Sequence, residues 1–167
     1  MTIREILQSD IAPFEVEDDV LILLFRYYLH RAPTINSVRS VSNNLANPEE
    51  KWTEYLTSLH IGKEQHHIYS SNRITEQQLG YFNLSDDDIV TRNTKGIVCC
   101  SYQEEPNINC LLRHLRNSIA HGRVYVRCIG NSSILIFDDY NKVNNQSARI
   151  VLTKSDLRQL KSVISRN

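Results

Sequence analysis

The sequence predicts a mainly α-helical protein, with a small C-terminal antiparallel β-sheet and a final helix. Two observations support this fold class. Apolar residues recur at helical spacing in the first part of the chain, and after Gly122 the spacing changes to the two-residue alternation of strands. With 167 residues the chain is long enough for one domain with a core of its own. We therefore expect a single domain over 1–167, with a helical bundle over about 1–122 and a β-meander plus a C-terminal helix over about 123–167.

The composition is that of an ordinary globular protein, with 41% hydrophobic and 23% charged residues. The 19 basic residues equal the 19 acidic ones, so net charge indicates no anionic partner and any such partner needs a local patch. The longest apolar run, residues 20–25, is too short to cross a bilayer. It follows acidic residues rather than the basic segment of a signal peptide, so we expect no membrane association and a cytoplasmic location.

The four cysteines, Cys99, Cys100, Cys110 and Cys128, form no CxxC pair. We expect them to be reduced thiols, as in a cytosolic protein. A zinc site needs clustered ligands, and the adjacent Cys99 and Cys100 fit poorly into one tetrahedral site. The sequence therefore predicts no metal and no cofactor.

The first predicted helix is the apolar segment that starts near Val20. A mostly acidic segment, residues 15–19, precedes it and basic residues end it, which suits the helix dipole, and Pro33 closes it. Apolar residues occur around most of this helix, so we expect it to be central and buried.

A second helix is predicted from Asn47, the expected cap, through Pro48 to Gly62, with Glu50 placed for a capping box. The apolar residues follow helical spacing: Trp52, Tyr55, Leu56 and Leu59. Three histidines lie at or beyond its end: His60, His66 and His67. They invite a metal-site interpretation, but surface histidines near a helix end are the favoured one.

Ser85 stands before three acidic residues, Asp86, Asp87 and Asp88. This pattern favours a capped helix start over a divalent-cation site, because acids at a helix N-terminus need no metal.

The third predicted helix opens at Pro106 and stops at Gly122. Its apolar positions recur at helical spacing: Ile108, Leu111, Leu112, Leu115 and Ile119. Three strands are expected after it, over 124–128, 134–137 and 150–152, and then a final amphipathic helix with Ser155 as its cap.

The polar face of the third helix carries the candidate chemistry. Arg113, Asn117 and His121 align at i, i+4 and i+8, with Arg116 and His114 on the two flanks. No acidic residue occurs between 106 and 137, whereas four arginines and two histidines do. The alternatives are a solvated helix face and a local cationic patch, and the absence of interspersed acids favours the patch.

Arginine and histidine together suit cleavage of RNA by transesterification. Imidazole can move a proton on or off the ribose 2′-hydroxyl or the leaving oxygen. Guanidinium binds phosphate and stabilises the charge that develops on it.

The stretch LRNSIAHG at residues 115–122 resembles the signature of the HEPN superfamily, an Arg separated by four to six residues from a His. The resemblance implies an up-down helical bundle that dimerises through its motif helices, often as a metal-independent endoribonuclease in toxin, abortive-infection or antiphage systems. It further implies that Arg116 and His121 are the catalytic pair, with Asn117 orienting them or the phosphate. The alternative is a non-catalytic HEPN module that binds nucleic acid or a partner protein.

Arg116 and His121 stand about 140° apart on an ideal helix, so they converge poorly within one chain. A homodimer with facing motif helices removes this difficulty. Arg113, Arg123, Arg127 and His114 are the expected contacts to RNA, and an antitoxin or defence-system protein is a possible further partner. HEPN toxins controlled by nucleotide transfer tend to carry a Tyr two residues after the His, whereas Arg123 stands there and Tyr125 two residues further on.

Overall fold

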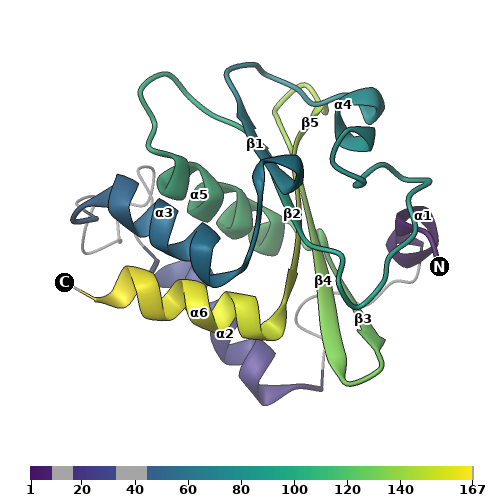
Figure 1. Cartoon of the computed structure of the whole chain (residues 1–167), viewed down its shortest axis with the longest axis horizontal. Helices are drawn as coiled ribbons and strands as arrows, with labels where there is room; N and C mark the ends of the chain where they lie inside the picture. The colour runs from purple at the N-terminus through teal and green to yellow at the C-terminus, as the bar shows by residue number, and fades with distance from the viewer. Residues whose placement is uncertain (9–16, 33–44, 167) are drawn as a thin grey trace.

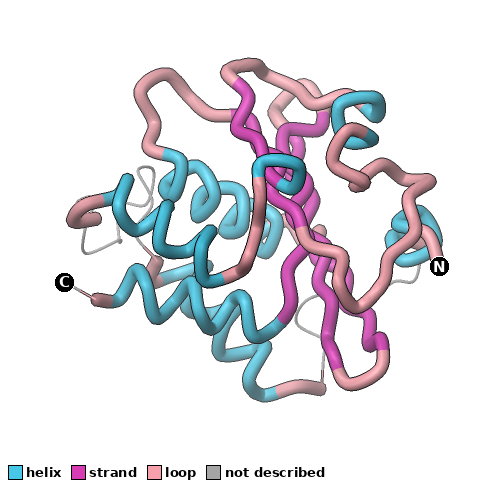
Figure 2. Tube along the Cα trace, in the orientation of Figure 1, coloured by secondary structure: helices cyan, strands magenta, loops and turns pink. Residues whose placement is uncertain are grey.

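The computed structural model describes residues 1–8, 17–32 and 45–166 and is an α/β structure built on a five-stranded mixed sheet (Figure 1). The sequence-based expectation of a mainly α-helical protein with a small C-terminal sheet is therefore wrong. Figure 2 shows the strands as a central band between two groups of helices. The sheet joins strands from both sides of Gly122, and two of them come from the part of the chain that was expected to contain helices.

The strands are β1 (His66–Tyr69), β2 (Gly96–Cys100), β3 (Val124–Ile129), β4 (Ser132–Tyr140) and β5 (Gln146–Thr153). Their order in the sheet is β1-β2-β5-β4-β3. The pair β1–β2 is parallel, and the other neighbours are antiparallel. The three predicted strands correspond to β3, β4 and β5.

The two missed strands lack the alternation that identifies a strand from sequence. All five residues of β2 are buried, because both faces of the sheet are covered. Ile97 and Cys99 enter the core on one face, while Val98 and Cys100 enter the core on the other. β1 has only four residues, two of them the histidines expected on the surface after the second helix.

The helices form two groups on opposite faces of the sheet (Figure 1). The larger group contains α2 (Asp19–His30), α3 (Pro48–Ser58), α5 (Asn107–Ala120) and α6 (Lys154–Ser165). The short helices α1 (Ile3–Leu7) and α4 (Glu76–Gly80) lie on the other face, and a single 3-10 turn, η1 (Lys63–Gln65), precedes β1. The four long helices correspond to four of the predicted helices, so the error in fold class concerns mainly the sheet.

For the long helices, the predicted first residues agree with the structure better than the predicted cap residues do. α2 is capped by Asp18, whose side chain accepts hydrogen bonds from two backbone amides. The expected contributions of residues 15 and 16 and of Pro33 lie outside the described residues. α3 begins at Pro48 as expected, but Asn47 makes no side-chain cap. α6 is capped by Thr153 rather than by Ser155.

No helix starts at Ser85, so that expectation is wrong. Asp88 instead accepts hydrogen bonds from the backbone amide and the hydroxyl of Ser85, both at 2.7 Å, and closes a turn. The other two acids form ion pairs, Asp86 with Arg149 at 2.8 Å and Asp87 with Arg4 at 3.0 Å. These contacts account for the acidic triplet without a cation.

Arg149 is the largest fully buried side chain in the described part of the protein. It makes two hydrogen bonds to Asp138, at 2.8 and 2.9 Å, and one to the carbonyl oxygen of Leu84 at 3.0 Å. Asp138 stands opposite Arg149 in the β4–β5 ladder, so the pairing fixes the register of the two strands. A buried guanidinium with this set of acceptors is compensated, and losing one partner leaves a buried charge.

Arg149→Leu is therefore expected to lower the free energy of unfolding by roughly 3–5 kcal/mol, because Asp138 loses its charge partner inside the fold. Urea unfolding followed by circular dichroism measures the change. Arg158→Leu, at an exposed position on α6, is the matched control and should shift stability by less than about 0.5 kcal/mol. Equal effects of the two substitutions would show that the buried cluster contributes no special stability.

Candidate active site

The motif helix α5 ends at the candidate site. His121 is its C-terminal cap residue and is exposed, and Gly122 follows with a φ of 69°. Glycine adopts this left-handed conformation without the penalty that a Cβ atom brings. The turn sends the chain directly into β3, so His121 stands at the junction between the helix and the sheet.

The polar face of α5, which was predicted to be an open cationic patch, is partly buried. Arg113 is only 6% exposed and makes two hydrogen bonds to Glu105, at 2.8 and 2.9 Å. Its guanidinium carbon also lies 3.8 Å from the centre of the Tyr102 ring. Glu105 precedes the acid-free window by one residue, which is why the window suggested an unpaired positive charge.

His114 is completely buried and pairs with a carboxylate from the sheet. Its Nδ1 lies 2.8 Å from Asp139 Oδ2, and its Nε2 lies 2.7 Å from the carbonyl oxygen of Cys100. Both ring nitrogens thus face oxygen acceptors, which favours the doubly protonated imidazolium. Burial is the largest single effect and lowers the pKa of His114, but hydrogen bonding to Asp139 and the interactions with Cys110 together outweigh burial and raise the pKa to about 9.

Asp139 also positions Asn117. The Asn117 side-chain amide donates to Asp139 Oδ2 at 3.2 Å, and the backbone amide of Tyr140 donates to Asp139 Oδ1 at 2.9 Å. On its other side Asn117 accepts a hydrogen bond of 3.4 Å from Arg116. A chain of contacts therefore runs from the sheet through Asp139 and Asn117 to the half-buried guanidinium of Arg116.

Four of the predicted residues line one cavity of about 550 Å³: Arg113, His114, Asn117 and His121. Asp139, Tyr140, Tyr102 and Asn141 are among the residues that complete its wall. Arg116 does not line it. Arg123 lies beside it, with its guanidinium carbon 4.5 Å from the centre of the Tyr140 ring, and Arg127 is exposed on β3.

Sequence reasoning missed Glu105, Asp139 and Tyr140. The second predicted strand ends at Phe137, but β4 continues to Tyr140. Alternation along β4 places Asp139 on the same face as Leu135 and Phe137, toward α5. Two acids directly after an apolar strand were the available signal, because a strand that extends past its apolar run carries polar side chains into the interior.

In the described part of the chain, each helix is either too short or too polar to span a lipid bilayer.

A family model described as HEPN pEK499 p136 matches residues 33–165. The protein therefore belongs to the HEPN superfamily, as the LRNSIAHG stretch suggested, and the family indicates a nuclease or nucleotide-binding function. Comparisons with curated proteins and with solved structures give no significant match.

The ion pair between His114 and Asp139 gives a prediction for the pH dependence of stability. The folded pKa of His114, about 9, lies above the 6.5 of an unperturbed histidine, so its contribution is complete below about pH 6.5 and is lost as pH rises through 9. Asp139→Asn should therefore cost more near pH 6 than near pH 10, by on the order of 1–3 kcal/mol, because Asp139 is one of the groups that raise this pKa. Urea unfolding of both proteins at several pH values measures this difference, and a difference that does not change with pH would contradict the assignment.

Proposed function

We propose that the protein is a metal-independent endoribonuclease whose active site lies at the C-terminal end of α5 and is completed by a second copy of the chain. The observation that carries the proposal is the cavity in which the motif residues His121 and Asn117 meet, with Arg116 attached to Asn117 at its edge. Family membership supports this proposal, since HEPN domains are often ribonuclease-like.

In the proposed reaction, the ribose 2′-oxygen attacks the adjacent phosphorus and the 5′-oxygen of the next nucleotide leaves. The products are a 2′,3′-cyclic phosphate and a free 5′-hydroxyl. His121 is the candidate for proton transfer with one of these oxygens, since it is exposed at the end of the helix and lines the cavity. Arg116 stabilises the charge on the phosphate, and Asn117 positions Arg116.

Arg116 is the residue that indicates a second protomer. Its side chain is half-buried, and its Nε has no hydrogen-bond partner among the described residues. It does not line the cavity that contains His121, in line with the angle of about 140° between the two positions on a helix. A partner copy packed across α5 would bring the Arg116 of one chain to the cavity of the other, through the symmetric contact that is commonest in homodimers.

The proposed RNA contacts follow from exposure. Arg127 is exposed and Arg123 half-buried beside Tyr140, so both can reach a phosphate backbone. Arg113 and His114 were expected to make such contacts too, but their burial and their acidic partners leave them as supports of the cavity wall.

A cytoplasmic toxin or defence role, with or without an antitoxin, is the biological setting that we propose.

The first prediction concerns catalysis. His121→Ala and Arg116→Ala should each reduce cleavage of mixed RNA by at least 100-fold, because general acid–base and charge-stabilising groups contribute about 10²–10⁴-fold each. Gel analysis of RNA fragments and detection of 2′,3′-cyclic ends measure this loss. Brief exposure to EDTA should leave the wild-type rate unchanged.

His30→Ala and Arg158→Ala, both at exposed positions on other helices, are the matched controls and should cleave like the wild type. Wild-type cleavage by folded His121→Ala or Arg116→Ala would refute the assigned roles. RNA binding without cleavage in the wild type would favour the alternative, a HEPN module that only binds.

The second prediction concerns the composite site. A mixture of Arg116→Ala and His121→Ala chains should regain on the order of a quarter of wild-type cleavage, since half of random dimers are mixed and each has one intact site. The measurement is cleavage after subunit exchange, with light scattering to establish the oligomeric state. A dead mixed dimer would show that each site lies within one chain, and a fully active monomer would exclude the composite site.

A further inference from the structure

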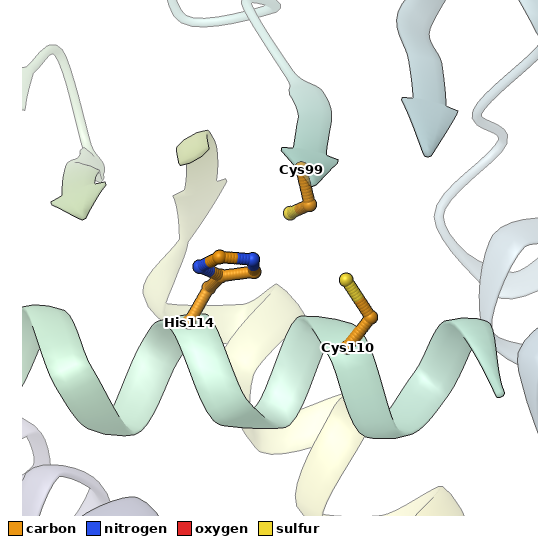
Figure 3. A group of neighbouring side chains, drawn as sticks. All are labelled: Cys99, Cys110 and His114. Atoms are coloured by element: carbon orange, nitrogen blue, oxygen red, sulfur yellow. The ribbon is translucent and has the colours of Figure 1, made fainter. Parts of the chain in front are cut away.

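Two thiols and an imidazole lie together in the core behind the cavity. Figure 3 shows Cys99 pointing from β2 toward α5, where Cys110 and His114 point back from successive turns. One donor atom from each residue lies within 4.8 Å of those of the other two, and all three residues are buried. No other group of three such residues comes as close in the described part of the chain.

The sequence-based argument against a zinc site does not apply to Cys99, Cys110 and His114. That argument was that the adjacent Cys99 and Cys100 fit poorly into one tetrahedral site. Strand geometry sends the side chains of these neighbours to opposite faces of the sheet, so Cys100 belongs to the other core. The second thiol comes from Cys110, and His114 follows it by four residues, on the same side of α5.

His114 is oriented as a metal-binding histidine is. A carboxylate, Asp139, holds its Nδ1 at 2.8 Å, which leaves Nε2 as the ligand atom. Histidines that bind zinc commonly give their second nitrogen to a carboxylate, which fixes the ring and strengthens the ligand.

The carbonyl oxygen of Cys100 is crowded at the centre of this group. It lies 2.7 Å from His114 Nε2, 3.0 Å from an Arg113 nitrogen and 3.4 Å from Cys110 Sγ. A carbonyl oxygen has two lone pairs, so three donors compete for it. An ion between these groups relieves the competition, because it replaces the protons of His114 and Cys110.

We propose that Cys99, Cys110 and His114 bind one Zn²⁺, with the carbonyl oxygen of Cys100 as the fourth donor. Zinc bonds of about 2.0–2.3 Å place tetrahedral ligand atoms about 3.3–3.8 Å apart, so the three side-chain donors, which lie within 4.8 Å of one another, need to close in by about 1–1.5 Å at most. Two thiolates neutralise the ion, which suits a buried site. Binding releases two thiol protons and the Nε2 proton of His114.

This zinc site is structural and does not depend on the proposed nuclease function. Four protein donors close the coordination sphere, so no position is left for a water or a substrate. The ion links β2 to α5 beneath the cavity and takes no part in RNA cleavage. Brief exposure to EDTA and prolonged removal of the metal therefore test different properties of the protein.

The test begins with full-length wild-type protein freed of metal by prolonged chelation under reducing conditions. Addition of Co²⁺ should give thiolate-to-cobalt charge-transfer absorption and the visible bands of tetrahedral Co²⁺, saturating at one ion per chain. Zn²⁺ should displace Co²⁺ and raise the thermal midpoint of the protein. Cys128→Ser, at an exposed cysteine outside the group, is the matched control and should give the same spectra.

Cys99→Ser and Cys110→Ser should each lose most of the charge-transfer absorption, and Zn²⁺ should no longer raise their thermal midpoints. The wild-type titration decides the question even if a variant fails to fold. Folded, reduced, metal-free wild-type protein without tetrahedral Co²⁺ bands would overturn the proposal. Bands that persist in the folded double variant Cys99→Ser/Cys110→Ser would also overturn it, since the metal would then sit elsewhere.

Discussion

The buried carboxylate of Asp139 is the contact on which the arrangement of the site depends. It comes from β4, where the pairing with β5 shifts register between Asp139 and Tyr140, and it reaches α5 from the sheet. One oxygen accepts from both His114 and Asn117, so a single carboxylate sets the rotation of the helix against the sheet. Because Asn117 also contacts Arg116, the position of the motif arginine depends on a residue more than twenty positions later in the chain.

The motif helix and the antiparallel part of the sheet could be predicted because their periods are clear. The apolar positions of α5 recur at helical spacing, and β3 alternates visibly. β2 could not be recognised in the same way, because a strand covered on both faces has no polar side to alternate with. β1 was not recognised because two of its four residues are histidines. His66 is hydrogen-bonded to the backbone of Gly62, and the ring of His67 packs against that of Tyr69. The LRNSIAHG stretch identified the superfamily without any of this information.

The net charge of the site depends on acidic residues outside the motif helix, which the sequence of that helix alone does not indicate. Residues 106–137 contain no acid, yet Glu105 and Asp139 lie just outside that window and neutralise Arg113 and His114. Helical spacing places side chains on a face, but only the packing of other elements decides whether solvent, a carboxylate or a carbonyl group meets them. The positive charge left near the cavity is consequently smaller and more localised than the sequence suggests, and it centres on Arg116 and Arg123.

The sheet combines strand pairings that close chain segments of different lengths. The meander β3–β4–β5 and the preceding helix α5 occupy one continuous stretch, so these contacts close short loops. β2 pairs with β5 across about fifty residues, and its parallel pairing with β1 requires a crossover. Closing longer loops costs more conformational entropy, so we expect β2 to pair with β5 after the meander has formed. Only six residues separate β2 from α5, so Cys99 and Cys110 can approach each other through a short loop before β2 pairs with β5.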